Sequence, residues 1–315
     1  MAQAAAEVWM YGDPELFGLK TALAAHHGCR PENIVVGEGI DGLLGYLVRL
    51  MIGPGDPVVT SLGAYPTFNF HVAGFGGSLI RVPYKGDHED PQALLDAAHL
   101  HRPRLVYISN PDNPMGSHHP AATISAMIDA LPEGSLLILD EAYIDLAPPG
   151  TAPTIDPNDP RVIRFRTFSK GYGMAGLRVG YAITAPELAQ AFDKLRNHFG
   201  VGRIAQAGAL AALSDQDWLA QVQTRVAKGR DRLAQIAHDN GAIPLPSATN
   251  FVTMDLGRDG DFARATLREL TARGVFVRMP GVAPLDRCLR VSVGDEAALG
   301  VFEEVFPQAL KAAKG

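Results

Sequence analysis

Apolar residues follow two alternating patterns up to about residue 185 of the chain: short continuous runs, and longer segments with helical spacing. Seven short runs have the length and composition of strands, at 33–37, 57–61, 78–84, 104–109, 135–140, 162–169 and 179–184. Helical patterns lie between several of them, at 41–51, 91–100 and 121–131. Continuous apolar strands separated by helices predict an α/β fold, a mainly parallel seven-stranded sheet with helices on both faces.

One pair of strands departs from this pattern. The runs 162–169 and 179–184 are too close together for a crossover helix between them. Parallel neighbours need such a crossover, and so at least one antiparallel neighbour is expected in the sheet.

The pattern changes at about residue 186. One long helical segment spans 186–213, and a second spans 217–241 and ends at a glycine typical of a helix C-terminus. Apolar runs at 248–256, 275–279 and 288–294, the helical pattern 261–274 and a final helix follow them. This part of the chain predicts a smaller C-terminal α+β domain.

Composition and charge narrow the functional classes. The 315 residues are 47% hydrophobic and 20% charged, as in soluble globular proteins, and the net charge of −6 disfavours nucleic acid or an anionic membrane as main partner. Cys29 and Cys288 form neither a metal-binding spacing nor a disulfide framework, and the ten histidines show no ligand spacing. The N-terminus lacks signal-peptide features, and no apolar stretch approaches the roughly 20 residues of a membrane span. A cytoplasmic protein without a metal site is predicted.

Polar residues gather where four apolar runs end. Ligands of open α/β sheets bind beside the carboxyl ends of the strands, and so these groups are interpreted together. They are Asp140 and Tyr143 after 135–140, Asn110 and Asn113 after 104–109, Thr167, Ser169 and Lys170 at the end of 162–169, and the glycine-rich turn 37–42. Taken singly, each group has an ordinary interpretation: Asp140 as a helix cap, the segment with Asn110 and Asn113 as a turn, the glycine-rich turn as a weak phosphate signal, and Lys170 as a solvated lysine. Their shared position favours one common ligand.

A single ligand suits all four groups: an aromatic aldehyde with a ring nitrogen, a phenolic oxygen and a phosphate. A buried carboxylate at Asp140 keeps such a ring nitrogen protonated, so that the ring accepts electrons from a substrate carbanion. Tyr143 and Asn113 donate hydrogen bonds to the ring oxygen. Lys170 forms an imine (a Schiff base) with the aldehyde and then acts as the acid–base group.

The phosphate and the ring need further contacts. The expected phosphate site comprises Arg178, Ser169, Thr167 and the backbone amides near Gly39 and Ile40 at a helix N-terminus. An aromatic side chain, either Tyr65 or Phe68, is expected to stack on the ring.

Over nearly its whole length, the chain resembles the fold-type I, pyridoxal-phosphate-dependent aminotransferases of class I/II, and especially their histidinol-phosphate aminotransferase branch. The resemblance depends on YGDPELFGLKTALA (11–24), VVGEGIDGLL (35–44), YPTF (65–68), NPDNPMG (110–116), LILDEAY (137–143), FRTFSKGYGMAGLRVGYAI (165–183), ATNFV (248–252) and CLRVSVG (288–294). It implies a transaminase that uses pyridoxal 5'-phosphate, an amino donor and a 2-oxo acid acceptor.

The resemblance also implies a homodimer with shared active sites. Tyr11 then belongs to the segment that reaches the partner's cofactor phosphate, Arg290 matches the arginine that grips a substrate carboxylate or phosphate, and Arg278 resembles a second anion contact. Phe68 matches the stacking position. The implied division is an N-terminal segment or dimer arm at 1–27, a large cofactor-binding domain at 28–205 and a small domain at 206–315.

Three features depart from the family pattern. Met115 stands where a threonine is usual, and Ile40 is bulky for a place where amides meet a phosphate. Only ten residues precede Tyr11, where family members have some 30–50, and so either the chain is truncated or its substrate pocket is more open than usual.

Alternatives remain at this point. A decarboxylase of the threonine-phosphate type has the same fold and uses an arginine such as Arg290 equally well. A non-catalytic cofactor-binding protein is a second alternative, and a hydrolase with a Ser169–Lys170 dyad is a third, which leaves Asp140, Asn113 and Tyr143 without a role. Arg278 and Arg290 are also open to a structural role, in which Arg290 pairs with a carboxylate of the fold.

Overall fold

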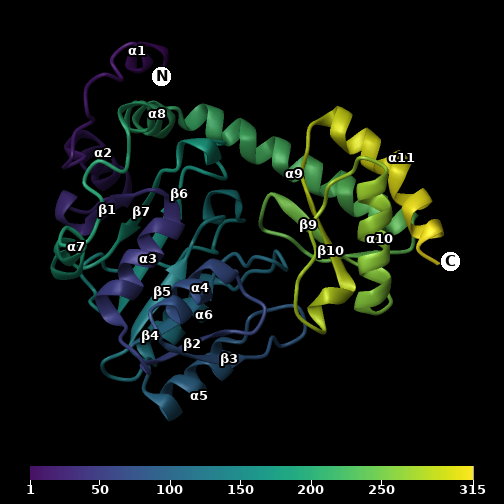
Figure 1. Ribbon diagram of the computed structural model, residues 1–315, viewed down its shortest axis with the longest axis horizontal. Helices are drawn as coiled ribbons and strands as arrows, with labels where there is room; N and C mark the ends of the chain where they lie inside the picture. The colour runs from purple at the N-terminus through teal and green to yellow at the C-terminus, as the bar shows by residue number, and fades with distance from the viewer. Residues whose placement is uncertain (315) are drawn as a thin grey trace.

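The computed structural model describes residues 1–314 and contains the predicted seven-stranded sheet (Figure 1). The strand order across the sheet is β1-β7-β6-β5-β4-β2-β3. The strands are β1 (Ile34–Gly37), β2 (Pro57–Ser61), β3 (Ser78–Val82), β4 (Leu105–Ser109), β5 (Leu136–Asp140), β6 (Val162–Thr167) and β7 (Gly180–Ile183). All seven fall within the apolar runs identified in the sequence.

Strand direction follows the length of the connections. The neighbours β3, β2, β4, β5 and β6 are parallel, whereas β7 is antiparallel to both β6 and β1. The prediction of an antiparallel neighbour at the short connection is therefore confirmed. The turn between β6 and β7 brings Lys170 and Arg178 to one end of the sheet.

Helices cover both faces of the sheet. The apolar residues of β5 alternate between them: Leu136 and Ile138 pack on one face, and Leu137 and Leu139 on the other. The first face is covered by α3 (Gly39–Met51), α4 (Pro66–Gly74) and α7 (Pro186–Phe192). The second is covered by α2 (Phe17–His27), α5 (Pro91–His101), α6 (Ala121–Asp129) and α8 (Arg203–Ser214). Two buried faces explain why the strands are continuous apolar runs.

The prediction of one continuous helix over 186–213 is wrong. The segment is divided into α7 and α8, and residues 193–202 between them are not helical. Gly200 and Gly202 lie at this break, where glycine's low helix propensity weakens a helix. Gly200 also packs against Glu38, because a Cβ atom there would lie 1.7 Å from the Glu38 carboxylate.

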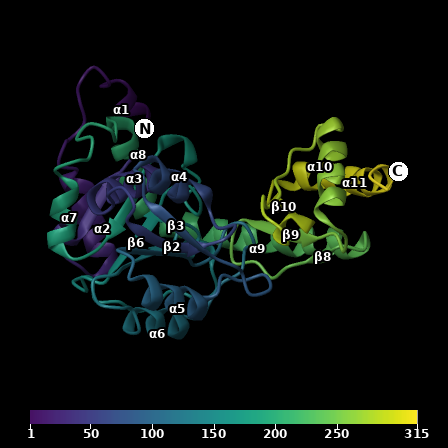
Figure 2. The ribbon, with the colours of Figure 1, turned by 60° about the horizontal axis from the view of Figure 1, so that its bottom comes forward.

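A second, three-stranded antiparallel sheet lies at the far end of α9 (Gln216–Asp239) (Figure 2). Its strands are β8 (Ile243–Pro244), β9 (Phe251–Asp255) and β10 (Cys288–Ser292), and α10 (Gly260–Ala272) and α11 (Glu296–Ala312) pack on it. Gly241, just past α9, adopts the left-handed conformation expected of a helix C-terminus. The expected strand 275–279 is reduced to an isolated bridge between Arg278 and Arg290.

The two sheets have separate apolar cores. The core around the second sheet contains residues from 233 to 310, and three others surround the seven-stranded sheet. A small cluster of Met115, Leu285 and Cys288 lies between the two. The exact boundaries 1–27, 28–205 and 206–315 stay a prediction. Short elements complete the described chain: α1 (Ala2–Ala5) and the 3₁₀ turns η1 (Pro31–Asn33), η2 (Ile144–Leu146), η3 (Ala175–Leu177) and η4 (Leu285–Arg287).

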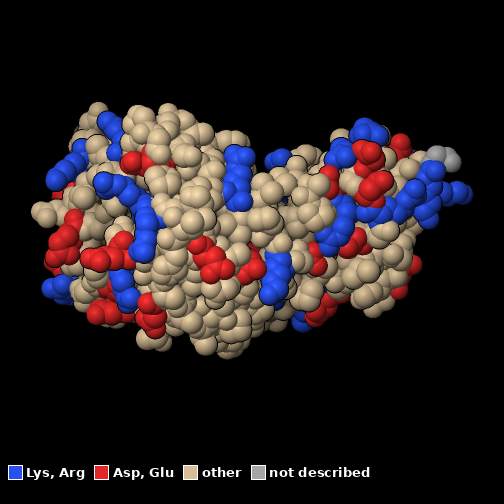
Figure 3. Space-filling view, turned by 90° about the horizontal axis from the view of Figure 1, so that it is seen from below, with Lys and Arg blue, Asp and Glu red and all other residues tan. Residues whose placement is uncertain are grey.

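The surface carries charges of both signs. On the face in Figure 3, Lys and Arg lie among Asp and Glu over both lobes, without a broad field of a single sign. Within residues 1–314, no helix has the length and apolar content that a membrane span requires.

Candidate active site

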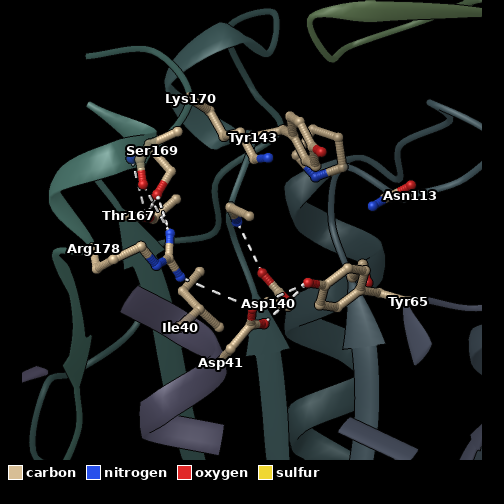
Figure 4. Close-up of a pocket in the computed structure, with 14 residues that line it drawn as sticks. Ile40, Asp41, Tyr65, Asn113, Asp140, Tyr143, Thr167, Ser169, Lys170 and Arg178 are labelled. Carbon is tan, nitrogen blue, oxygen red and sulfur yellow. Dashed lines mark hydrogen bonds and ion pairs between the residues drawn. The ribbon is translucent and has the colours of Figure 1, made fainter. Parts of the chain in front are cut away.

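A pocket opens at the carboxyl ends of the parallel strands, where the sequence predicted a ligand (Figure 4). Most of the predicted residues line it together, although they come from distant parts of the chain. The lining includes Ile40, Asn113, Asp140, Tyr143, Thr167, Ser169, Lys170 and Arg178, and also Asp41, Tyr65, Ser109 and Ala175.

Asp140 ends the central strand β5 and is buried at the floor of the pocket. Its carboxylate accepts hydrogen bonds from the Tyr107 hydroxyl at 2.7 Å and from the Ala142 backbone N–H at 3.0 Å. Burial raises the pKa of Asp140 to about 6, and the Tyr107 hydrogen bond opposes that rise. A carboxylate held in this way is well suited to face a cationic ring nitrogen.

Lys170 lies in the turn after β6 with its ammonium nitrogen 5.2 Å from the centre of the Tyr143 ring. Burial and the positive charge of Arg290 lower the pKa of Lys170, whereas Asp140 opposes the shift. A lowered pKa increases the neutral fraction of the amine, which is the form that attacks an aldehyde. The environment therefore favours a nucleophile over a solvated cation.

Arg178 reaches across the other end of the pocket. Its guanidinium donates hydrogen bonds to the Ser169 hydroxyl at 3.4 Å and to the Ala175 carbonyl at 3.1 Å, and it lies 3.9 Å from Asp41. Its backbone φ of +53° is unusual for a residue with a side chain, and such strained residues cluster at functional sites. The Ser169 backbone N–H donates to the Thr167 hydroxyl at 3.1 Å, which orders this group of side chains.

The N-terminus of α3 meets this group. Gly39 has a φ of +78°, and a Cβ atom there would lie 2.4 Å from the Arg178 guanidinium. Only glycine permits both the left-handed backbone and this close approach. The first N–H groups of a helix point at such a position and attract an anion. Ile40 lines the pocket, and its side chain packs mainly into the apolar core, which accommodates its bulk.

The two aromatic candidates for ring stacking are separated by the structure. Phe68 is fully buried and stacks on Tyr107, with ring centroids 4.8 Å apart, and it does not line the pocket. Tyr65 lines the pocket, and its hydroxyl donates to the Asp41 carboxylate at 3.1 Å. The geometry thus favours Tyr65 over Phe68.

Asn113 connects the pocket to the second sheet. The Arg290 guanidinium, on β10, donates a hydrogen bond to the Asn113 side-chain oxygen and lies 4.9 Å from the centre of the Phe251 ring. Burial lowers the pKa of Arg290. Arg278 pairs with Arg290 through backbone hydrogen bonds, but its side chain is exposed over Phe276. Neither arginine belongs to the pocket lining; Arg290 contacts it through Asn113.

Tyr11, an expected cofactor contact, and Met115, a departure from the family pattern, also lie outside the pocket of this chain. Tyr11 is 79% exposed and packs its ring on Phe199, with centroids 4.7 Å apart. Met115 is buried in an apolar cluster with Leu285 and Cys288, while its backbone N–H donates to Asp112 at 3.1 Å.

Tyr107 and Asp41 are two polar residues at the site that were not predicted from the sequence. Tyr107 lies within β4, where a tyrosine in an apolar run is typical of core packing. Asp41 lies in the first turn of α3, where an acidic residue is typical of dipole compensation.

Comparisons with known proteins agree with this geometry. The family model described as aminotransferase class I and II matches residues 2–305. The chain belongs to the class I and II aminotransferases.

Several relatives of this aminotransferase resemble it over nearly its full length. The histidinol-phosphate aminotransferase of Moorella thermoacetica is 33% identical, over 99% of this chain and 80% of that protein. The histidinol-phosphate aminotransferase of an Anaeromyxobacter species is 36% identical, over 93% of this chain and 80% of that protein. A crystal structure of histidinol-phosphate aminotransferase from Sinorhizobium meliloti, in complex with pyridoxal-5'-phosphate, is 53% identical with a TM-score of 0.96, over 98% of this chain and 85% of that one.

The family and the fold confirm the main predictions. This aminotransferase is an enzyme of the transaminase type, has the expected α/β architecture and uses pyridoxal 5'-phosphate. The family, together with relatives that are aminotransferases, favours transamination over the decarboxylase, hydrolase and non-catalytic alternatives.

Proposed function

We propose that this aminotransferase transfers an amino group between a phosphate-bearing amine of the histidinol-phosphate type and a 2-oxo acid. The observation that supports the substrate class is the pairing of Arg278 and Arg290 through two backbone hydrogen bonds beside Asn113. Two guanidinium groups on adjacent segments provide contacts for a phosphate or a carboxylate. The names of the relatives point to the same class.

The roles of the cofactor-binding residues are also proposals. Bound pyridoxal 5'-phosphate supplies an electron sink for the carbanion formed next to the substrate nitrogen. Asp140 faces the ring nitrogen, Tyr143 and Asn113 donate to the ring oxygen, and Tyr65 packs on the ring. The donor set fits such a group, because the buried Asp140 carboxylate and the cluster of Arg178, Ser169 and Thr167 line different parts of the same cavity (Figure 4).

Lys170 has two proposed tasks. Its amine would hold the cofactor by condensing with its aldehyde, with loss of water, and would carry a proton between the substrate and the cofactor. Ser169, Thr167, Arg178 and the amides at Gly39 and Ile40 would bind the phosphate and so hold the cofactor within reach of the lysine.

The experiment that tests the substrate class compares amines with a constant acceptor, 2-oxoglutarate. Histidinol phosphate is expected to react with a higher kcat/KM than histidinol, which lacks only the phosphate, and to release no carbon dioxide. Arg278→Gln and Arg290→Gln are expected to reduce this preference. Equal kcat/KM values for the two amines in the unaltered enzyme would contradict the proposed substrate class.

Assembly, domain boundaries and location are further proposals. We infer a homodimer in which Tyr11 of each chain contacts the cofactor phosphate of the other. The proposed units are 1–27, 28–205 and 206–315. The separate core that contains residues 233–310 supports a C-terminal unit, whereas α2 and α8 pack on the seven-stranded sheet. The free thiols of Cys29 and Cys288 support a reducing, cytoplasmic location.

A further inference from the structure

An acidic side chain lines the end of the pocket where the cofactor phosphate is expected. Asp41 lies in the first turn of α3, and its carboxylate is 3.9 Å from the Arg178 guanidinium. A negative charge at this place repels an anion. Asp41 therefore has a purpose in the pocket other than phosphate binding.

The nearer partner of Asp41 is Tyr65. The Tyr65 hydroxyl donates to both carboxylate oxygens, at 3.1 Å and 3.2 Å. Figure 4 shows the Asp41 carboxylate between the side chains of Tyr65 and Arg178, with dashed lines to each. Hydrogen bonds to a charged acceptor are among the strong ones in proteins. Of these two neighbours, Tyr65 is the one that Asp41 holds.

The contact between Asp41 and Arg178 is weaker. Their side chains are 39% and 48% exposed, and such exposed ion pairs contribute little because water screens them. Arg178 also has other partners, since its Nη1 donates to the Ser169 hydroxyl and to the Ala175 carbonyl. The position of Arg178 therefore depends little on Asp41.

A second contact joins Asp41 to the helix that follows Tyr65. His71 is on α4, and its Nε2 lies 3.1 Å from the Asp41 backbone carbonyl. The His71 ring also packs on α3, because a Cβ atom at Gly45 would lie 2.8 Å from it. These contacts use the backbone of Asp41 and a neighbouring turn, and so they persist when the Asp41 side chain is replaced. Such a replacement acts on Tyr65 and leaves the docking of α4 intact.

The Tyr65 side chain is anchored at both ends. Its backbone immediately precedes α4, which begins at Pro66, and proline restricts the backbone there. Its hydroxyl is bonded to Asp41 at the other end. The phenol ring between these two anchors lines the pocket.

We propose that Asp41 is a positioning residue that holds the Tyr65 ring where it packs on the cofactor ring. Its carboxylate thereby connects the start of α3, which would bind the cofactor phosphate, with the side chain that would bind the ring. A ring already held in place loses less conformational entropy when the cofactor binds, and so the hydrogen bond strengthens cofactor binding. The inference rests on the proposed role of Tyr65.

Equilibrium binding of pyridoxal 5'-phosphate to the protein without cofactor tests this role. Asp41→Ala and Asp41→Asn both lack the charge, but only Asn keeps an acceptor oxygen for the Tyr65 hydroxyl. The dissociation constant of Asp41→Ala is therefore expected to exceed that of Asp41→Asn on the order of fivefold. Equal dissociation constants would overturn the proposal. Asp217→Ala, at an exposed acidic residue in the first turn of α9, is the matched control and is expected to bind as the unaltered protein does.

Double variants identify the partner through which Asp41 acts. Tyr65→Phe keeps the ring and removes the hydroxyl, and so Asp41→Ala and Asp41→Asn are expected to bind equally well in this background. In an Arg178→Lys background, the difference between them is expected to remain. A difference that persists with Tyr65→Phe, or one that disappears with Arg178→Lys, would overturn the assignment to Tyr65.

The visible circular dichroism of the bound cofactor depends on how its ring is held. Asp41→Ala and Tyr65→Phe are expected to alter this band in the same way, whereas Asp41→Asn is expected to retain it. An unaltered band in Asp41→Ala would overturn the proposal, because a purely structural role in α3 lowers the melting temperature without changing the band. If melting shows that Asp41→Ala does not fold, Tyr65→Phe decides, since it removes the same bond: cofactor binding and a band equal to those of the unaltered protein would overturn the proposal.

Failure of this inference is distinguishable from failure of the proposed function. The measurements contain no amine and no 2-oxo acid, and so they are independent of the substrate class. Tyr65→Ala tests the packing of Tyr65 on the ring: it is expected to weaken binding, and binding equal to that of the unaltered protein would contradict that role and the inference with it. Weak binding by Tyr65→Ala, combined with equal binding by Asp41→Ala and Asp41→Asn, would overturn the role of Asp41 alone.

Discussion

At the residue scale, Asp140 illustrates how burial and a single hydrogen bond oppose each other. Burial disfavours the charged carboxylate and raises its pKa to about 6, whereas the Tyr107 hydroxyl stabilises the charged form. Tyr107→Phe removes the stabilising bond, so the pKa of Asp140 in the protein without cofactor is expected to rise further. A carboxylate, and not a carboxylic acid, pairs with the ring nitrogen. When the pH is lowered, Tyr107→Phe is therefore expected to lose cofactor affinity at a higher pH than the unaltered protein does.

The measurement is the cofactor dissociation constant as a function of pH. The cofactor affinity of the unaltered protein is expected to fall as the pH drops through about 6, and that of Tyr107→Phe is expected to fall at a higher pH. Tyr181→Phe is the matched control, because Tyr181 is equally buried in the sheet but bonds His27 instead. Identical pH profiles for Tyr107→Phe and Tyr181→Phe would contradict the role assigned to Tyr107.

A second prediction at this scale concerns Asp140 itself. Asp140→Ala removes the charge that keeps the ring nitrogen protonated, while the phosphate and lysine contacts remain. We expect kcat to fall on the order of a hundredfold or more, since preorganised charge is a large catalytic term, and cofactor content to fall far less. The ratio of the two losses, measured by turnover and by bound-cofactor absorbance, checks this, with exposed Asp129→Ala as control. Parallel losses would indicate that Asp140 serves binding only.

At the element scale, the cationic end of the pocket is built where the N-terminus of α3 meets the β6–β7 turn. Gly39→Ala combines a strained backbone with a Cβ atom 2.4 Å from the Arg178 guanidinium. Gly55→Ala shares the positive φ, +83° against +78°, but its Cβ atom meets nothing within 4 Å. Both variants are expected to lose about 1 kcal/mol of unfolding free energy from backbone strain. Only Gly39→Ala is expected to bind cofactor weakly as well.

Chemical unfolding and cofactor titration of both variants provide the check. Because Gly55→Ala isolates the cost of the backbone, any extra loss of cofactor affinity in Gly39→Ala measures the contact with Arg178. Equal cofactor affinities in the two variants would show that Arg178 moves aside without consequence, and that the close packing at Gly39 is not required for binding.

The hydrophobic patterns of individual elements explain which parts of the structure can be predicted from the sequence. Buried parallel strands are continuous apolar runs, and so their ends, and with them Asp140 and Lys170, could be located from the sequence alone. The break at 193–202 was missed because the apolar spacing continues across it, while the packing of Gly200 on Glu38 is a tertiary contact. Such contacts leave no local pattern.

The direction of the side chains at the start of α4 could not be predicted from the sequence either. Tyr65 immediately precedes α4 and faces the pocket, whereas Phe68 lies one turn later and packs on Tyr107. The choice between them depends on the rotation of α4 against the sheet.

At the scale of the whole molecule, aromatic side chains near the N-terminus are exposed in a single chain. Trp9 is 81% exposed and Tyr11 79%, and Phe17 and Phe199 are also exposed. The segment is nevertheless held in place, since Arg203 on α8 donates a hydrogen bond to Glu7 at 2.9 Å. Large apolar side chains in a fixed exposed segment are typical of an interaction surface. They support the proposal that Tyr11 acts in the active site of a second copy.

Subunit complementation tests this sharing of active sites. A Lys170→Ala chain lacks the nucleophile, and a Tyr11→Ala chain is expected to retain the cofactor poorly. A mixed dimer of the two contains one intact site, with Lys170 from one chain and Tyr11 from the other. Equal mixing with free exchange is expected to restore about a quarter of the normal number of sites. Activity at limiting cofactor, before and after mixing, is the measurement.

The matched control mixes Lys170→Ala with Arg178→Ala. Both residues line the same pocket of one chain, and so no mixed dimer of these two contains an intact site. Recovery with Tyr11→Ala but not with Arg178→Ala therefore requires that Tyr11 acts across the interface. Recovery in neither mixture, or an active monomer in sedimentation, would contradict the shared site. Tyr11 would then have to act within its own chain, where its ring packs on Phe199 outside the pocket.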